Sequence, residues 1–142
     1  MPNDDFLAVL DFGSQYAHLI AKRIRHLGVY TEIFPPSIDT DSLEAAKGII
    51  LSGGPASVFA EDVPAFNPEI LNLSQPILGL CYGHQLMAKL FDGRVANTGQ
   101  GEFGKASLRQ LNPSPLWKDV ADNSQVWMSH QDSVTELPQD FQ

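Results

Sequence analysis

The single cysteine of this chain, Cys81, is the residue whose type and setting best suit covalent chemistry. Residues 79–83 read Gly-Leu-Cys-Tyr-Gly, a G-x-C-x-G pattern between an apolar run at 76–80 and a segment of helical periodicity at 83–91. A sharp strand-to-helix turn with this pattern, the nucleophile elbow, holds a nucleophile out at the end of a sheet. Most lone cysteines instead pack as small apolar side chains. The context favours the displayed, reactive thiol.

The same turn predicts groups that would assist Cys81. Free backbone N–H groups and the positive end of the helix dipole favour thiolate over thiol at the start of the following helix. The Tyr82 N–H is expected to bind the oxyanion formed when the thiolate attacks an amide carbon. A second donor is expected from the Ser-Gly-Gly-Pro loop at 52–55, which lacks the Lys-Ser/Thr ending of a phosphate-binding loop.

Apolar and alternating segments predict the scaffold. We expect strands at 6–10, 29–34, 48–51 and 76–80, with helices at 16–27, 41–46 and 83–91 between and after them. Strands that are apolar throughout belong to a parallel sheet covered on both sides, so the predicted class is α/β, an open, mostly parallel sheet with helices on both faces. Such sheets carry their sites at the carboxyl ends of the strands.

Single residues and short segments predict further details of the fold. Residues 11–14 should form a turn, with Ser14 as helix N-cap, and Gly28 should end the first helix. The apolar positions of that helix are Leu19, Ile20, Ile24 and Leu27. Short strands at 94–97, 105–111 and 125–129 should be antiparallel additions or the sheet edge. Trp127 is expected in the core or at a domain interface.

Composition excludes several functions. The 142 residues carry a net charge of -8 and a pI of about 4.7, so neither nucleic acid nor an anionic membrane is expected as a partner. No apolar run reaches the ~18 residues of a membrane span, and the N-terminus lacks the pattern of a secretory leader, which predicts a cytoplasmic protein. One cysteine allows no internal disulfide, and no metal site is expected.

Four segments together resemble the class I glutamine amidotransferases over nearly the whole chain: 11–16 (DFGSQY), 51–55 (LSGGP), 79–85 (GLCYGHQ) and 126–130 (VWMSH). The resemblance implies hydrolysis of glutamine through a covalent thioester at Cys81. It implies an oxyanion hole formed by Gly54 and Tyr82. It also implies that glutamine is held by Gly53, Gln85, Ser129 and His130, the last two at its α-amino and carboxylate end.

Within this family, the segments are most similar to the branch that makes GMP from XMP. That similarity implies that ammonia passes to a separate ATP pyrophosphatase (synthetase) domain, which would use ATP and Mg, while this domain needs no cofactor.

Family members complete a catalytic triad with a downstream His-Pro-Glu motif that is not in this sequence. We therefore expect residues 1–142 to be the N-terminal part of the amidotransferase domain, with little activity alone. A homodimer of the longer protein is left open.

Residues within the chain offer weaker candidates for the base. His84, three residues after Cys81, is expected to be a packed or partly solvated helix-start residue, and His130 has Asp132 as its nearest acidic neighbour. His18 and His26 should lie on the surface of the first helix. Asp11 ends a strand and could face the site, but a turn-forming role explains it equally well.

Three other functions compete with this one. The chain could serve another class I amidotransferase, or it could be a binding module that keeps the fold without the chemistry. An intact cysteine elbow argues against the second. A flavodoxin-like nucleotide binder ranks last, because residues 13–16 hold too few glycines for a phosphate loop.

Overall fold

The computed structural model describes residues 5–13 and 15–142. Its first half alternates strands and helices, and its second half is a long hairpin. The strands are β1 (Phe6–Leu10), β2 (Thr31–Phe34), β3 (Ala46–Leu51), β4 (Ile77–Gly79), β5 (Arg94–Leu108) and β6 (Ser124–Glu136). The α-helices are α1 (Tyr16–His26) and α2 (Tyr82–Leu90), and three short 3-10 helices are η1 (Asp41–Leu43), η2 (Pro68–Asn72) and η3 (Pro115–Trp117).

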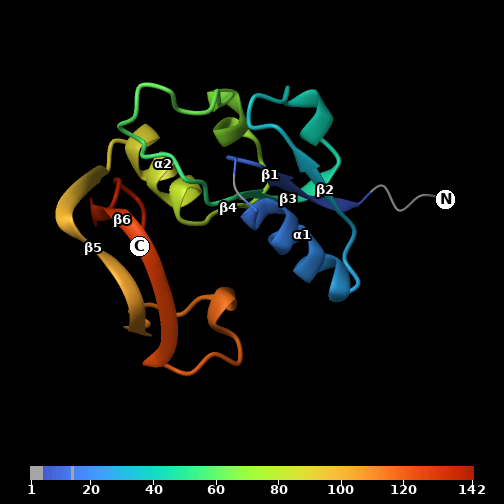
Figure 1. Cartoon of the computed structure of the whole chain (residues 1–142). Helices are drawn as coiled ribbons and strands as arrows, with labels where there is room; N and C mark the ends of the chain where they lie inside the picture. Colours follow the sequence, from blue (N-terminus) through green and yellow to red (C-terminus); the bar gives the residue numbers. More distant parts are fainter. Residues whose placement is uncertain (1–4, 14) are drawn as a thin grey trace.

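The first four strands form a parallel sheet in the order β2-β1-β3-β4, which confirms the predicted fold class. Figure 1 shows α1 on one face of this sheet and α2, with η1 and η2, on the other. The chain leaves β1 toward β2 and then crosses back to β3, so the carboxyl ends of β1 and β3 border a topological switch point. Ligand sites of open α/β sheets lie at such points.

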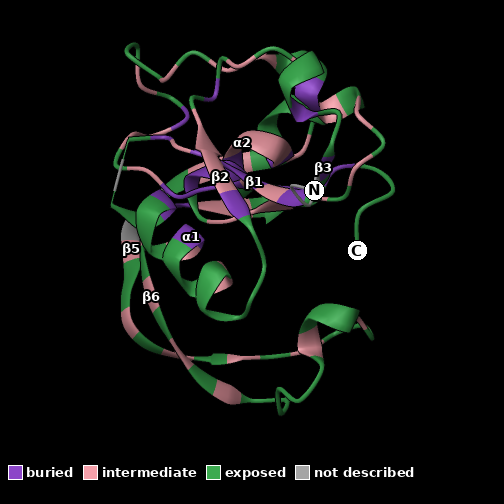
Figure 2. Cartoon of the chain, turned by 90° about the vertical axis from the view of Figure 1, so that its right-hand side faces the viewer, coloured by how far each residue is buried: buried purple, intermediate pink, exposed green. Residues whose placement is uncertain are grey.

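The buried residues concentrate on this parallel sheet, as Figure 2 shows, whereas most of the hairpin is intermediate or exposed. Leu10 and Leu51, at the ends of β1 and β3, are fully buried. Just beyond β1, the ring of Phe12 packs against that of Tyr82 at 5.1 Å between centroids. Burial of each such side chain contributes about 1.5–3 kcal/mol. The best-packed part of the molecule therefore lies directly beneath the ends of the strands.

Helix α1 has the predicted period, but its buried stripe differs from the four large residues expected. Ala17 and Ala21 are fully buried, while Leu19 and Leu27 are 54% and 82% exposed. Small side chains allow the helix axis to lie close to the sheet, so the large residues flank the contact. Gly28 ends the helix with a left-handed φ of +83°, as predicted. Ser14, the expected N-cap, lies outside the described residues.

The expected helix at 41–46 is shorter than predicted. Only η1 is helical, and β3 already begins at Ala46, where it pairs with Phe6. Ala46 and Gly48 are buried and Lys47 between them is exposed. This alternation is typical of a strand, and the short apolar stretch did not distinguish it from a helical turn.

Strands β5 and β6 form a separate two-stranded antiparallel sheet that extends away from the parallel one (Figure 1). The pieces expected at 94–97 and 105–111 belong to one strand with an irregularity between Asn97 and Glu102. Trp127 is 73% exposed, with the Lys105 ammonium 5.7 Å from its ring centroid, so it is not a core residue. Among the described residues, no helix is long and apolar enough to cross a bilayer.

Candidate active site

Cys81 sits at a strained turn between β4 and α2. Its backbone has φ +48° and ψ −112°, a conformation that costs a non-glycine residue of the order of 1–3 kcal/mol, and its side chain is exposed. A Cβ on Gly79 would lie 2.7 Å from the His84 nitrogen, and one on Gly83 would lie 2.3 Å from the Leu51 carbonyl oxygen. Both flanking glycines are therefore required by close backbone packing, and the predicted elbow geometry is confirmed.

The loop after β3 is fastened to the elbow and to the loop after β1. The Leu51 carbonyl accepts a hydrogen bond from the Leu80 N–H at 2.9 Å, and the Ser52 carbonyl accepts one from the Gly83 N–H at 3.2 Å. The Ser52 hydroxyl accepts from the Phe12 N–H and donates to the Gly53 carbonyl. These bonds bring the carboxyl ends of β1, β3 and β4 to one place.

Gly53 and Gly54 follow directly and lie beside the cysteine. A Cβ on Gly53 would be 3.3 Å from the Cys81 Cβ and 3.9 Å from its Sγ. A Cβ on Gly54 would be 2.5 Å from the Phe12 carbonyl oxygen. Within the described chain, the N–H groups of Gly54 and Tyr82 meet no acceptor. Both residues line the same cavity as Cys81, so two free donors are available beside the thiol-bearing cavity, as an oxyanion hole requires.

A cavity of about 430 Å³ opens in front of the thiol. The elbow, the loop after β3 and interior positions of β5 and β6 all contribute to its wall. Six of the seven residues predicted for the site line it: Cys81, Gly54, Tyr82, Gln85, Ser129 and His130. The seventh, Gly53, lies against Cys81 itself. The segments that the sequence singled out separately are therefore brought to one cavity.

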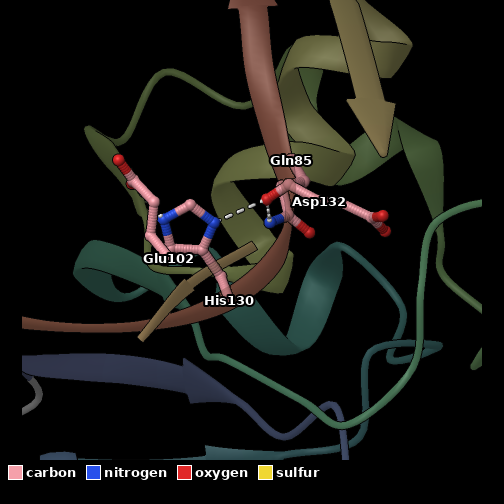
Figure 3. A network of polar contacts seen from close by, with 4 residues as sticks. All are labelled: Gln85, Glu102, His130 and Asp132. Atoms are coloured by element: carbon pink, nitrogen blue, oxygen red, sulfur yellow. Dashed lines mark hydrogen bonds and ion pairs between the residues drawn. The ribbon is translucent and has the colours of Figure 1, made fainter. Parts of the chain in front are cut away.

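A polar network supports one side of this cavity, as Figure 3 shows. The backbone carbonyl of Asp132 accepts a hydrogen bond from the buried Gln85 Nε2 at 2.8 Å and is also 2.8 Å from His130 Nδ1. The other ring nitrogen, Nε2, is 2.9 Å from Glu102 Oε2. Asp132 as a whole is 4% exposed: its Oδ2 accepts from the Ser57 hydroxyl, and its Oδ1 has no partner among the described residues.

Both ring nitrogens of His130 face oxygen acceptors. A neutral imidazole carries one N–H and can satisfy only one of them, whereas an imidazolium donates to the Asp132 carbonyl and to the Glu102 carboxylate together. In this arrangement neither nitrogen presents a lone pair to the thiol. His130 is therefore placed to hold and orient groups and not to accept the Cys81 proton.

His84 lies beside a second cavity, of about 280 Å³, that also reaches Cys81, Glu102 and His130. Burial, and secondarily the nearby His130, lowers the pKa of His84 below its ordinary value of 6.5. Its ring makes no hydrogen bond to Cys81 within the described structure. The expectation of a packed or partly solvated helix-start histidine is confirmed, because His84 lies in the first turn of α2 and keeps part of its surface exposed.

The remaining candidates for a base are also accounted for. His18 and His26 are exposed on α1, as predicted. Asp11 forms the predicted turn, because its Oδ1 accepts the Gly13 N–H at 2.9 Å. In the described part of the chain no histidine or carboxylate is hydrogen-bonded to Cys81, and no three acidic, histidine or cysteine side chains gather closely enough to bind a metal ion.

Sequence reasoning missed Ser57 and Glu102 and gave Asp132 only a minor place. Ser57 and Asp132 each follow a recognised motif by two positions, Glu102 is far from all of them, and none belongs to a pattern with its own chemistry. The strand alternation of β6, read three residues further than its expected end at 129, would have placed Asp132 on the pocket side with His130. Glu102 offered no comparable signal, because its role depends on the pairing of β5 with β6.

Comparison with known proteins agrees with this geometry. Residues 8–142 match the family model described as glutamine amidotransferase class-I. The chain is 50% identical over 138 residues to the glutamine-hydrolysing GMP synthase of Campylobacter lari and 49% identical over 138 residues to that of Nostoc punctiforme. Each alignment covers 96% of this chain, but only 27% and 26% of the respective relatives, so the chain spans about a quarter of their length.

Solved structures share the fold. A protein from Thermoplasma acidophilum, described as one subunit of a GMP synthase, superposes with a TM-score of 0.78 at 28% identity, covering 94% of this chain and 68% of that one. A glutamine amidotransferase from Thermotoga maritima gives a TM-score of 0.72 at 20% identity, covering 95% and 63%, which shows the fold alone. The chain belongs to the class I glutamine amidotransferase family. Within that family, the relatives it resembles at about 50% identity are glutamine-hydrolysing GMP synthases.

Proposed function

We propose that this chain is the glutamine-hydrolysing part of a GMP synthase, with Cys81 as its nucleophile. The observation that carries the proposal is the exposed, strained thiol beside two unpaired N–H groups at the mouth of a cavity. The thiolate attacks the side-chain amide carbon of glutamine, and the N–H groups of Gly54 and Tyr82 receive the oxyanion. The C–N bond then breaks, the thiol proton leaves with the nitrogen as ammonia, and water hydrolyses the glutamyl thioester.

The opposite wall of the cavity is suited to the amino-acid end of glutamine. Asp132 supports this assignment, because its buried Oδ1 lacks a partner among the described residues and the α-ammonium group supplies both the charge and the donors that it needs. Ser129 and His130 line the same cavity and are proposed at the α-amino and carboxylate groups, with Gln85 beneath them. Gly53 is proposed to shape the backbone next to the thioester.

The wider role rests on the relatives. Proteins named glutamine-hydrolysing GMP synthases match this chain at about 50% identity and are far longer. We propose that residues 1–142 form the N-terminal part of an amidotransferase domain, and that its ammonia reaches an ATP pyrophosphatase domain that converts XMP to GMP with ATP and Mg. The base for Cys81 is then supplied from outside residues 1–142.

The test uses 6-diazo-5-oxo-L-norleucine, a glutamine analogue whose diazoketone alkylates an active nucleophile. Incubation of the chain should add one analogue residue at Cys81, as located by peptide mass spectrometry, and L-glutamine should slow the addition. The same chain should release little ammonia from glutamine, because no described side chain is bonded to the thiol as a base.

Two controls make the result decisive. Cys81→Ser should take up no analogue, and L-glutamate, which lacks the reacting amide but keeps the amino-acid end, should protect less well than L-glutamine. If the analogue labels other residues as readily as Cys81, or if glutamine leaves the rate unchanged, the glutaminase assignment is wrong.

A further inference from the structure

The β5–β6 pairing is interrupted next to the cavity. Asn97 pairs with Asp132 and Glu102 pairs with His130, so residues 98–101 of β5 face Gln131 alone. Gly99 and Gly101 have left-handed φ angles of +77° and +48° in this bulge. A bulge locally disrupts the backbone ladder that would otherwise fix the partner strand. The cavity-lining part of β6 therefore depends on side chains for its position.

Two of those side chains converge on one atom. The Asp132 carbonyl oxygen receives Gln85 Nε2 from α2 and His130 Nδ1 from β6, each at 2.8 Å (Figure 3). A carbonyl oxygen has two lone pairs, so these two donors fill its hydrogen-bonding capacity. The backbone at Asp132, and with it the direction of the buried carboxylate, is held by this pair of contacts.

Glu102 helps to fix the orientation of the His130 ring. Its Oε2 lies 2.9 Å from His130 Nε2, and the His130 side chain is only 17% exposed, although that of Glu102 is 62% exposed. With the carboxylate in place, both ring nitrogens have an oxygen partner, and the ring is held with Nδ1 facing the Asp132 carbonyl. Without it, the ring loses one of its two contacts and can turn away from that carbonyl oxygen.

We propose that Glu102 is a positioning residue for glutamine: through His130 it fixes the Asp132 segment, and so places the carboxylate that receives the α-ammonium group. The inference rests on the proposed function, because it needs glutamine to occupy the cavity. It adds a residue that touches neither the reacting atoms nor the substrate. Glu102 lies directly after the bulge, so it also ties the end of the bulge to β6.

The experiment measures how much L-glutamine is needed to halve the rate at which iodoacetamide modifies Cys81. For Glu102→Ala we expect this concentration to rise roughly threefold to fivefold, the effect of losing a partly exposed ion pair. Glu102→Gln should recover most of the affinity, since its amide can donate to Nε2 and keep the proton on Nδ1. Glu136→Ala is the matched control, because Glu136 pairs with Arg94 at 3.7 Å at the exposed far end of the same pairing.

A second ligand distinguishes the loss of the positioning role of Glu102 from general damage to the cavity. Glutaramic acid is glutamine without the α-amino group, so Glu102→Ala should weaken its protection of Cys81 much less than it weakens the protection by L-glutamine. Equal glutamine protection in both chains would overturn the proposal, and so would an equal loss of protection by the two ligands.

Nuclear magnetic resonance of the ¹⁵N-labelled imidazole provides a readout that does not depend on glutamine. The ring nitrogens of His130 should have different chemical shifts in Glu102→Ala and in the native chain, because Nε2 loses its carboxylate partner and the Nδ1 contact with the Asp132 carbonyl is no longer held. If glutamine fails to protect even the native chain, the proposed function falls, whereas an unchanged His130 spectrum in Glu102→Ala refutes the positioning role by itself.

Discussion

The substitution Gly83→Ala would affect the stability of the elbow in two opposite ways, through helix propensity and through steric overlap. Gly83 lies in the first turn of α2, where alanine is favoured over glycine by about 1 kcal/mol through helix propensity. The new Cβ, however, would meet the Leu51 carbonyl oxygen at 2.3 Å, the Leu51 Cβ at 2.5 Å and the Leu51 carbonyl carbon at 2.7 Å. The first of these distances is roughly 1 Å shorter than an ordinary carbon–oxygen contact.

Neither side of this contact can move easily. Strand β3 is paired on one side with β1 and on the other with β4, and the Gly83 N–H is bonded to the Ser52 carbonyl. Overpacking costs typically 1–3 kcal/mol, and a contact with paired backbone belongs at the upper end, about 3 kcal/mol. Subtracting the propensity gain leaves a net destabilisation of about 2 kcal/mol, or a fall in melting temperature of roughly 8 °C.

The assay is thermal and urea unfolding of the native chain and of two variants. Gly48→Ala is the matched control, because the one tight contact of its Cβ would be with the end of the Leu7 side chain, at 3.0 Å, which can shift, while Pro76 lies at ordinary distances of 3.6 and 3.8 Å. We expect Gly48→Ala to remain within about 1 kcal/mol of the native chain, with either sign. A Gly83→Ala chain as stable as the native one, or more stable, would refute the close-packing argument for the elbow.

Three further predictions concern the walls of the cavity. Ser57→Ala should lower the free energy of unfolding by about 1–3 kcal/mol in urea titrations, because it leaves the buried Asp132 carboxylate without its hydroxyl donor. Asp132→Asn should weaken glutamine protection of Cys81 by about tenfold or more, because it removes the charge that would receive the α-ammonium group. The free energy of unfolding should not fall, since the substitution removes a buried charge but keeps the side-chain shape. Unchanged protection would contradict the proposed α-ammonium site. Because folding lowers the pKa of His84, the native chain should lose stability as the pH falls through 6.5, and His84→Gln should show a smaller loss between about pH 7.5 and 5.5. An identical loss in both chains would show that other groups account for it.

The sequence predicted the parts of the fold that depend on local patterns. Continuous apolar runs located three of the parallel strands and alternation located the fourth, β2, while Gly28 and the glycines around Cys81 marked positions that need glycine. The burial of Ala17 and Ala21 instead of Leu19 was not predictable from periodicity, because it depends on how closely α1 approaches the sheet.

The residues of the candidate site also fall into two groups, those next to a local sequence pattern and those joined only by tertiary contacts. The elbow, Gly54 and Tyr82 are adjacent in sequence to recognisable turns, and the structure brings them to one cavity. The contacts of Ser57 and Glu102 with β6 join residues separated by 75 and 28 positions. Such pairs are set by tertiary packing and strand register, which no local pattern encodes.

Cys81 is exposed and has no second cysteine anywhere in the chain. A sulfenic acid formed on it by peroxide therefore cannot be rescued by an internal disulfide. Capture by an external thiol such as glutathione is reversible, whereas further oxidation to the sulfinic acid is not. The exposure that makes the Cys81 sulfur available to a substrate therefore also makes the chain dependent on external thiols for protection against irreversible oxidation.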